Sequence, residues 1–167
     1  MFCLPVPPGN GHSWLRGAIV LVFSLTLIAG LLLWGPGVEA AAAIALSQQP
    51  STEVKVLMGT ETGELKFVPN QLQLAANTRY KLVLSNPSPQ KHYFTAKDFA
   101  DAVWTQKVEA GNVEIKGAIH ELELKPGAKA EWVFVTLKPG SYDLRCTIAG
   151  HTEAGMIGTI RISDQAS

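Results

Sequence analysis

Cysteine is almost absent from this chain of 167 residues, which contains only Cys3 and Cys146. A small domain held together by several disulfides is therefore excluded. Cys3 lies close to the N-terminus, ahead of a long apolar run, so removal of that region would leave Cys146 as the only thiol. A lone cysteine in an exported protein is either a reactive thiol or a metal ligand, and Cys146 is a candidate for both roles.

An excess of charge of either sign is also missing, because 14 Lys and Arg side chains are matched by 14 Asp and Glu side chains. The chain has no basic surplus of the kind that attracts nucleic acid, so no nucleic-acid partner is expected. It has no acidic run that would indicate a disordered tail. The length fits one domain plus a leader.

The first 40 residues have the pattern of a signal peptide or membrane anchor. Arg16 is followed by an apolar run from Ala18 to Trp34, and Gly35-Pro36-Gly37 ends any helix there. Small residues around Ala40 suit a cleavage site, but the run 18–34 is also long enough to span a bilayer. The positive flank predicts that the rest of the chain is exported, to a periplasm or an equivalent lumen. Cleavage near Ala40 is favoured over a retained anchor.

After an Ala-rich linker over residues 41–52, residues 53–167 have the pattern of one all-β domain. Apolar and polar residues alternate in short runs between turns such as Asn86-Pro87-Ser88-Pro89 and Pro139-Gly140. This pattern predicts an antiparallel sandwich or barrel. Residues 96–108 break the pattern, and a short helix or an irregular insertion is expected there. The expected strands cover residues 54–58, 64–68, 71–74, 80–84, 92–94, 113–115, 119–124, 130–137, 142–146 and 156–162.

The loop from Cys146 to Met156 brings together a thiol, an imidazole and a thioether. Gly150 and Gly155 let the backbone bend so that His151 and Met156 can face the same point as Cys146. Two His, one Cys and a weak axial Met are the donors of a mononuclear electron-transfer copper site. Taken singly, the three side chains could be a buried thiol, a surface histidine and a core methionine. Their occurrence together in one short loop favours the copper site.

The second histidine has to come from upstream, and His92 and His120 are the candidates in the exported part. His92 opens an expected strand after the Pro-rich turn, whereas alternation predicts that His120 faces solvent at the start of the strand 121–124. His92 is therefore preferred. Glu153 is an alternative to Met156, although a loop carboxylate is usually solvated. The predicted ligands of one copper ion per chain are His92, Cys146, His151 and Met156.

These residues resemble the cupredoxin family, the small blue-copper proteins that include plastocyanin and azurin. The Phe67-Val68-Pro69-Asn70 stretch and the closing strand over residues 157–162 also match, and the resemblance covers residues 53–163. It implies a Greek-key β-sandwich with a type 1 copper site. The Cys–His spacing is longer than in plastocyanin, and the His–Met spacing is longer than in azurin. Where the family often has Asn after the first ligand His, this chain has Tyr93, which leaves the hydrogen bonds to the Cys sulfur open.

The resemblance implies a carrier of single electrons between larger redox proteins, and no enzymatic activity. In the family the ligand His of the C-terminal loop is the exit for the electron. An apolar ring around His151 would suit brief docking of a redox partner, and the domain is expected to be a monomer. An oxidase or nitrite reductase would need additional copper ligands. The ring would consist of Ile148, Ala149, Ala154 and Ile157.

Two other classes of function remain compatible with the sequence. The first is a copper chaperone or store that uses the same ligands to pass copper on. Reversible loss of copper to an apo acceptor would favour it, although a chain with only three Met offers no exposed Met cluster. The second is a metal-free sandwich that acts as an interaction module, which leaves the convergence of Cys146, His151 and Met156 unexplained.

Overall fold

The computed structural model describes residues 45–164. The predicted leader, the cleavage site near Ala40 and the first part of the predicted linker lie outside these residues. Within 45–164, no helix is both long enough and apolar enough to cross a membrane. The description that follows therefore concerns the predicted β domain and the residues just before it.

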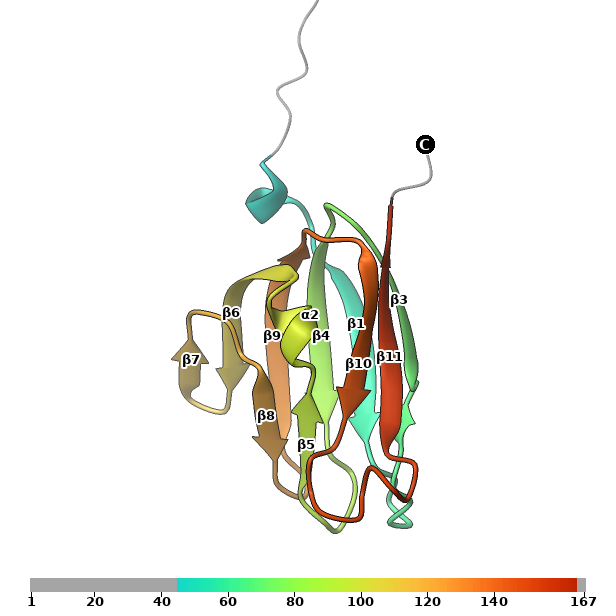
Figure 1. Cartoon of the computed structure of the whole chain (residues 1–167). Helices are drawn as coiled ribbons and strands as arrows, with labels where there is room; N and C mark the ends of the chain where they lie inside the picture. Colours follow the sequence, from blue (N-terminus) through green and yellow to red (C-terminus); the bar gives the residue numbers. More distant parts are fainter. Residues whose placement is uncertain (1–44, 165–167) are drawn as a thin grey trace, which may run out of the picture. The chain divides into compact units, whose positions relative to one another are not determined.

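The described residues form two β-sheets that pack face to face (Figure 1). The larger sheet has the strand order β2 (Phe67–Val68), β1 (Thr52–Met58), β4 (Arg79–Ser85), β9 (Lys129–Thr136), β6 (Val103–Ala110) and β7 (Val113–Ile115). The smaller sheet has the order β3 (Gln71–Ala75), β11 (Ile157–Ser163), β10 (Gly140–Arg145), β5 (His92–Thr95) and β8 (Glu121–Leu124). The predicted all-β sandwich is confirmed.

Two strand pairs differ from the antiparallel arrangement that was expected. β1 runs parallel to β4 in the larger sheet, and β3 runs parallel to β11 in the smaller one. β3 lies between β1 and β4 in the sequence but belongs to the other sheet, so no hairpin fixes the direction of β4 relative to β1. Both sheets are consequently mixed, with antiparallel pairing elsewhere.

The segment 96–108 contains the short helix that was expected, α2 (Lys97–Ala100), but its second half is not irregular. Residues from Val103 onward form β6, which pairs with β9 inside the larger sheet. The register shifts between Thr105 and Lys107. This bulge changes the parity of the inward-facing positions, so that Val103, Thr105 and Val108 are all buried. The bulge hides the alternation in the sequence, which is why the strand was missed.

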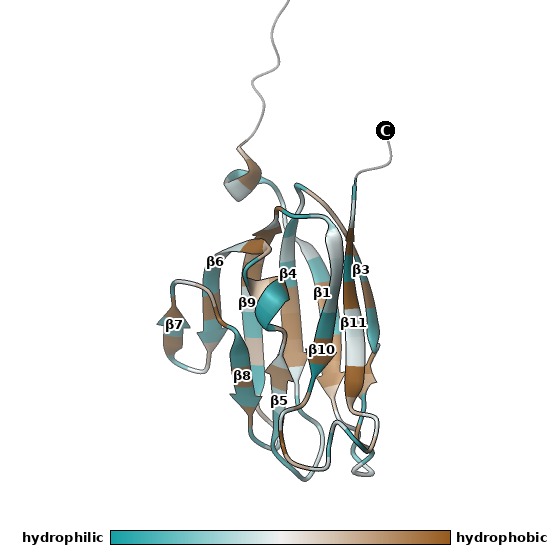
Figure 2. Ribbon diagram, viewed as in Figure 1, coloured by the Kyte–Doolittle hydropathy of each residue, from teal (hydrophilic) through white to brown (hydrophobic). Residues whose placement is uncertain are grey.

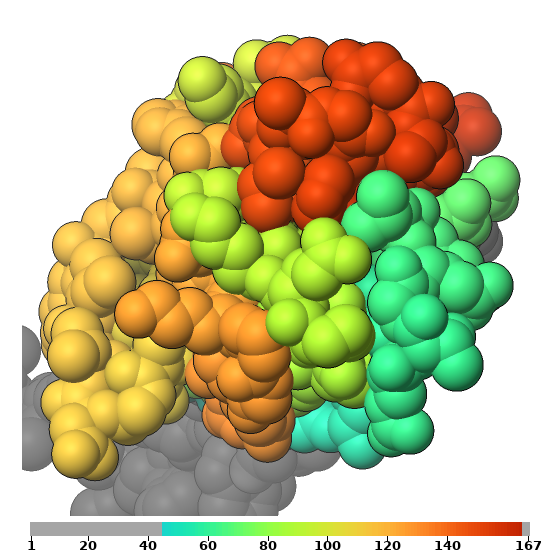
Figure 3. Space-filling view, turned by 90° about the horizontal axis from the view of Figure 1, so that it is seen from below, coloured from blue at the N-terminus to red at the C-terminus, as the bar shows by residue number. Residues whose placement is uncertain are grey.

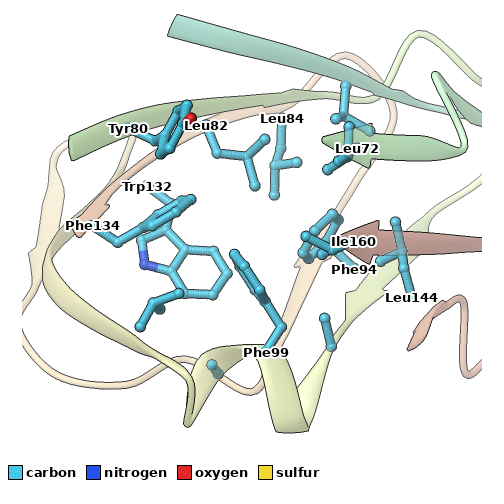
Figure 4. Close-up of a cluster of buried hydrophobic side chains, with 14 of the residues drawn as sticks. Leu72, Tyr80, Leu82, Leu84, Phe94, Phe99, Trp132, Phe134, Leu144 and Ile160 are labelled. Atoms are coloured by element: carbon cyan, nitrogen blue, oxygen red, sulfur yellow. The ribbon is translucent and has the colours of Figure 1, made fainter. Parts of the chain in front are cut away.

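The core between the sheets is rich in aromatic rings (Figure 4). Trp132 of β9 lies at its centre, and the ring centroids of Phe94, Phe99 and Phe134 lie 6.4, 5.7 and 5.3 Å from that of Trp132. Phe99 comes from α2, so this helix closes the core between the two sheets. Figure 2 colours much of the α2 and β8 ribbons as hydrophilic, and Lys97 and Asp98 of α2 are exposed. This core makes the rigid support for the loops at one end of the sandwich.

The segment just before β1 is hydrogen-bonded to the larger sheet. It contains a 3₁₀ turn, η1 (Leu46–Gln48). Arg79 Nη1 donates to the carbonyl of Gln49 at 2.9 Å, and Gln106 Nε2 donates to the carbonyl of Ser47 at 3.3 Å. η1 lies at the end of the sandwich opposite the loop that joins β10 to β11 (Figure 1).

Candidate metal centre

Three of the four predicted ligands lie together at one end of the sandwich. His92, Cys146 and His151 each present a ligand atom, and these atoms all lie within 4.8 Å of one another. Cys146 Sγ is 3.4 Å from His151 Nδ1, and the two imidazole ring centroids are 5.2 Å apart. The relative exposures of His92, Cys146 and His151 are 0%, 0% and 8%. The sandwich therefore brings a thiol and two imidazoles into one buried cluster.

Backbone hydrogen bonds close the loop that joins β10 to β11. The amide of Cys146 donates to the carbonyl of Met156 at 3.1 Å, and the amide of Met156 donates to the carbonyl of His151 at 2.9 Å. Gly150 and Gly155 have φ angles of +82° and +96°, so the backbone bends at both glycines, as expected. Met156 is fully buried. Its backbone is thus bonded to both other predicted ligands of the loop.

A buried asparagine orders the turn that leads into His92. Asn86 Nδ2 donates to the carbonyls of Gln90 and Leu124, both at 2.8 Å. Asn86 Oδ1 accepts from the amide of Ser88 at 3.0 Å. These bonds tie the Pro-rich turn to the end of β8, so the position at which β5 starts is fixed by the fold.

The loop after β1 approaches the other side of His92, and sequence reasoning missed this contact. Gly59 has a φ of +81°, and a Cβ atom at this position would lie 2.7 Å from His92 Nε2 and 2.8 Å from Ser88 Cβ. In the space-filling view the loops over residues 59–66, 86–91 and 147–156 lie side by side on this end (Figure 3). Only glycine leaves room for this approach. A single glycine in a turn carries no sequence signal that points to a distant histidine.

His92 has an unusual environment for a buried polar side chain. Neither of its ring nitrogens has a hydrogen-bond partner among residues 45–164, although both are buried. Burial, and then the neighbouring His151, hold the pKa of His92 below its usual value, so the ring is neutral at neutral pH. A buried polar atom without a partner is rare unless it serves a ligand. A neutral imidazole beside a thiol and a second imidazole fits copper.

The hydrogen bond to the Cys sulfur comes from the backbone. The amide of Tyr93 donates to Cys146 Sγ at 3.3 Å. The side chain of Tyr93 is engaged elsewhere, because its hydroxyl donates to Glu123 Oε2 and its ring lies 5.6 Å from Lys91 Nζ. An amide donor is available whatever the side chain, so the departure from Asn at this position does not remove the bond to sulfur.

The two competing donors lie outside the cluster. His120 is exposed, and its Nε2 lies 2.7 Å from Asp101 Oδ1. Glu153 is exposed on the loop and is not among the clustered ligand residues. The expectation that His120 faces solvent is confirmed.

Alanine at the two candidate histidines should therefore have different effects on copper binding. His92→Ala removes a nitrogen of the cluster, and we expect the copper affinity to fall by more than about 100-fold. Mutating residues that only hydrogen-bond to metal ligands already lowers metal affinity by about 10–100-fold. His120→Ala should leave the affinity unchanged. Competition with a chromogenic copper chelator measures both. Loss of binding in His120→Ala with retention in His92→Ala would contradict the assignment of the ligand.

The chain is similar to several known proteins. A family model described as a cupredoxin-like domain matches residues 25–157. The chain is 29% identical over 126 residues to the major isoform of chloroplastic plastocyanin from Arabidopsis thaliana, which covers 75% of this chain and 68% of that one. A multicopper oxidase from Pediococcus acidilactici matches with a TM-score of 0.56 at 14% identity, over 74% of this chain and 28% of that one. Auracyanin B is 27% identical with a TM-score of 0.47, over 70% of this chain and 91% of that one.

The oxidase comparison shows only that the fold is shared, because the identity is low and the match covers a minor part of that enzyme. The family model is more informative, because its range includes every predicted ligand from His92 to Met156. It also spans more than half of the chain. The chain therefore belongs to the family of cupredoxin-like domains.

Proposed function

We propose that this chain binds one copper ion through His92, Cys146, His151 and Met156 and carries single electrons between redox proteins. Bound copper supplies a one-electron couple between Cu(I) and Cu(II). The observation that carries the proposal is the buried cluster of one thiol and two imidazoles, with both nitrogens of His92 unpaired among the described residues. The relation to plastocyanin supports the electron-carrying role.

Each proposed ligand is held in place by the fold. His92 stands at the start of β5, and the depressed pKa of this ring keeps a lone pair available at neutral pH. Cys146 follows the last residue of β10, and the Tyr93 amide would stabilise the negative charge of its thiolate. Met156 precedes β11 and is fully buried, and we assign it the weak axial position. Ligands anchored in a stiff sandwich move little when the charge of the site changes, which favours fast electron exchange.

The surface around His151 is suited to brief contacts with a redox partner. Ala149, Ala154 and Ile157 are exposed, and Ile157 has a relative exposure of 50%. Ile148 is partly buried beside them. His151 itself is only 8% exposed, so a partner would approach it through this small apolar surface. A surface of this size favours transient association over permanent assembly, and we propose that the domain works as a monomer.

We further propose that the domain acts outside the cytoplasm. The pattern of residues 1–40 supports export, with cleavage near Ala40 or retention of an anchor over residues 18–34. The plastocyanin relative is itself described as chloroplastic. A single-thiol copper site needs no disulfide and is compatible with an oxidising compartment.

A Cu(II) titration of residues 41–167, with Cys146→Ser in parallel, tests the proposed function. Residues 43–167 form one compact unit with its own core, so this fragment is a suitable sample. We expect one equivalent of copper to give an intense thiolate-to-copper absorption band and a narrow copper hyperfine splitting in the EPR spectrum. Both signals should be lost in Cys146→Ser, because that variant has no thiolate to donate charge to copper.

Two other outcomes would argue against an electron carrier. Weak or colourless binding, or binding that survives without Cys146, would contradict the proposed site. Normal binding followed by ready transfer of copper to an apo acceptor would instead favour the copper chaperone or store.

A further inference from the structure

The strand that carries His92 is held in its sheet mainly from one side. β5 pairs with β8 through four residue pairs, from His92 with Leu124 to Thr95 with Glu121. On its other side β5 pairs with β10 through one residue pair only, Thr95 with Arg145. The backbone ladder between the His92 strand and the Cys146 strand therefore ends just where the ligand loop begins. Beyond this pair, the two ligand segments meet through contacts that involve side chains.

A single carboxylate oxygen of β8 contacts both segments where the ladder ends. Glu121 Oε2 accepts a hydrogen bond from Thr95 Oγ1 at 2.7 Å and another from Thr147 Oγ1 at 2.8 Å. The two hydroxyl oxygens lie 3.3 Å apart. Thr95 is the last residue of β5, and Thr147 directly follows Cys146. The carboxylate thus joins the strand of one ligand to the loop of another.

The negative charge of Glu121 strengthens the hydrogen bonds that it accepts from the two threonine hydroxyls. The hydrogen bonds from Thr95 and then Thr147 hold the pKa of Glu121 below its usual value, so the group is ionised at neutral pH. Hydrogen bonds to an ionised acceptor are shorter and stronger than neutral ones. Thr95 is 2% exposed, so its hydroxyl depends on protein partners rather than on water.

We propose that Glu121 is a positioning residue that fixes the spacing between the His92 strand and the Cys146 loop. This inference rests on the proposed copper site. The side chain of Tyr93, the residue after His92, does not join the two segments, because its hydroxyl binds Glu123. The hydrogen bond from the Tyr93 amide to Cys146 Sγ, 3.3 Å long, joins the two segments directly and therefore depends on their spacing.

Glu123 offers a matched control on the same strand. It also lies on β8 opposite β5, where it pairs with Tyr93 in the register and accepts hydrogen bonds from the Tyr93 hydroxyl and from Lys91 Nζ. No hydrogen bond or ion pair between Glu123 and the Cys146 loop is found within residues 45–164. Glu121→Ala and Glu123→Ala therefore remove the same group from the same strand, and only the first removes the bridge to Thr147.

The test uses the full chain, expressed and purified with its own N-terminus, and two measurements. In the copper-free protein, hydrogen exchange of the Tyr93 amide should become about tenfold faster in Glu121→Ala. In the copper titration, the affinity should fall by about 10-fold or more in Glu121→Ala, with a shifted reduction potential. Glu123→Ala should leave the copper affinity at the wild-type value and change Tyr93 exchange less than Glu121→Ala does, because it frees only the Tyr93 hydroxyl. Glu121→Gln should restore part of both effects, because the amide oxygen can still accept from the two hydroxyls but carries no charge.

Thr147→Val gives a second test in which folding is not at risk, because Thr147 is exposed. It should reproduce the faster Tyr93 exchange of Glu121→Ala, since it removes one end of the same bridge. Equal Tyr93 exchange in Glu121→Ala, Glu123→Ala and the wild type would overturn the proposal. Failure of the wild type to bind copper through Cys146 would instead refute the proposed function. The Tyr93 exchange measurement would still decide whether Glu121 holds the His92 strand and the Cys146 loop together.

Discussion

Gly59→Ala is expected to abolish the copper site while leaving a folded domain. The added methyl group would lie 2.7 Å from His92 Nε2 and 2.8 Å from Ser88 Cβ. His92 is fully buried and stands at the start of a paired strand, so its ring can yield only by leaving the cluster. The φ of +81° adds a backbone cost of about 1–2 kcal/mol for any L side chain. The copper titration should show no thiolate-to-copper band in this variant.

Gly63→Ala is the matched control for this substitution. Gly63 lies in the same loop and has a similar φ of +84°, but a Cβ there would find only Pro89 Cγ at 3.9 Å. It should lose about 1–2 kcal/mol of unfolding free energy from the backbone, as Gly59→Ala does, and should still bind copper. Urea denaturation of the copper-free proteins measures this loss of unfolding free energy in both variants. If both variants bound copper equally well, the contact between Gly59 and His92 would have no role in shaping the site.

Trp132→Ala should cause the largest loss of stability among single substitutions in the core. The side chain is 2% exposed and is surrounded by Phe94, Phe99 and Phe134. Its Nε1 donates to Thr105 Oγ1 at 3.1 Å, and Thr105 would lose this partner. Replacing a buried aromatic with Ala typically costs about 3–5 kcal/mol, which is a large part of the roughly 5–15 kcal/mol that holds a domain folded. Urea denaturation of the copper-free protein, followed by far-UV circular dichroism, measures the loss.

Trp104 provides the control, because it lies on the neighbouring strand β6 and is 50% exposed. Trp104→Ala should cost about 1 kcal/mol or less, as most surface substitutions do. Comparable losses in the two variants would show that the aromatic cluster around Trp132 is not the main support of the sandwich. The same comparison tests whether Trp132 is a packing residue.

The loop from Cys146 to Met156 was predictable because its information is local. The donor types, their spacing and the two glycines all lie within one short stretch, and a hairpin between two strands keeps such a stretch together. The burial of alternate residues in β3 and β11 was predictable for a similar reason, since alternation depends only on neighbours in sequence. The resemblance to cupredoxins rested on the same local motif.

Other features of the site have no local signal. The bulge after Thr105 reverses the parity of β6, so the strand could not be recognised by alternation. The Tyr93 amide that reaches Cys146 Sγ is a backbone group, which every non-proline residue possesses. The contact of Gly59 with His92 joins two loops that only the packing of β1 near β5 brings together.

By itself, the sequence determined the β-sandwich class and the family, and it predicted the three proposed donors of the C-terminal loop. Strand periodicity and the spacing of these donors depend only on residues that are near one another in sequence. Only the tertiary structure places His92 in the cluster and His120 outside it, and only it shows the contacts made by Gly59, Tyr93 and Glu121. This placement depends on how β5 is aligned with β8 and β10. That alignment is fixed by the packing of the whole core, and residues distant in sequence meet only after the sheets have formed.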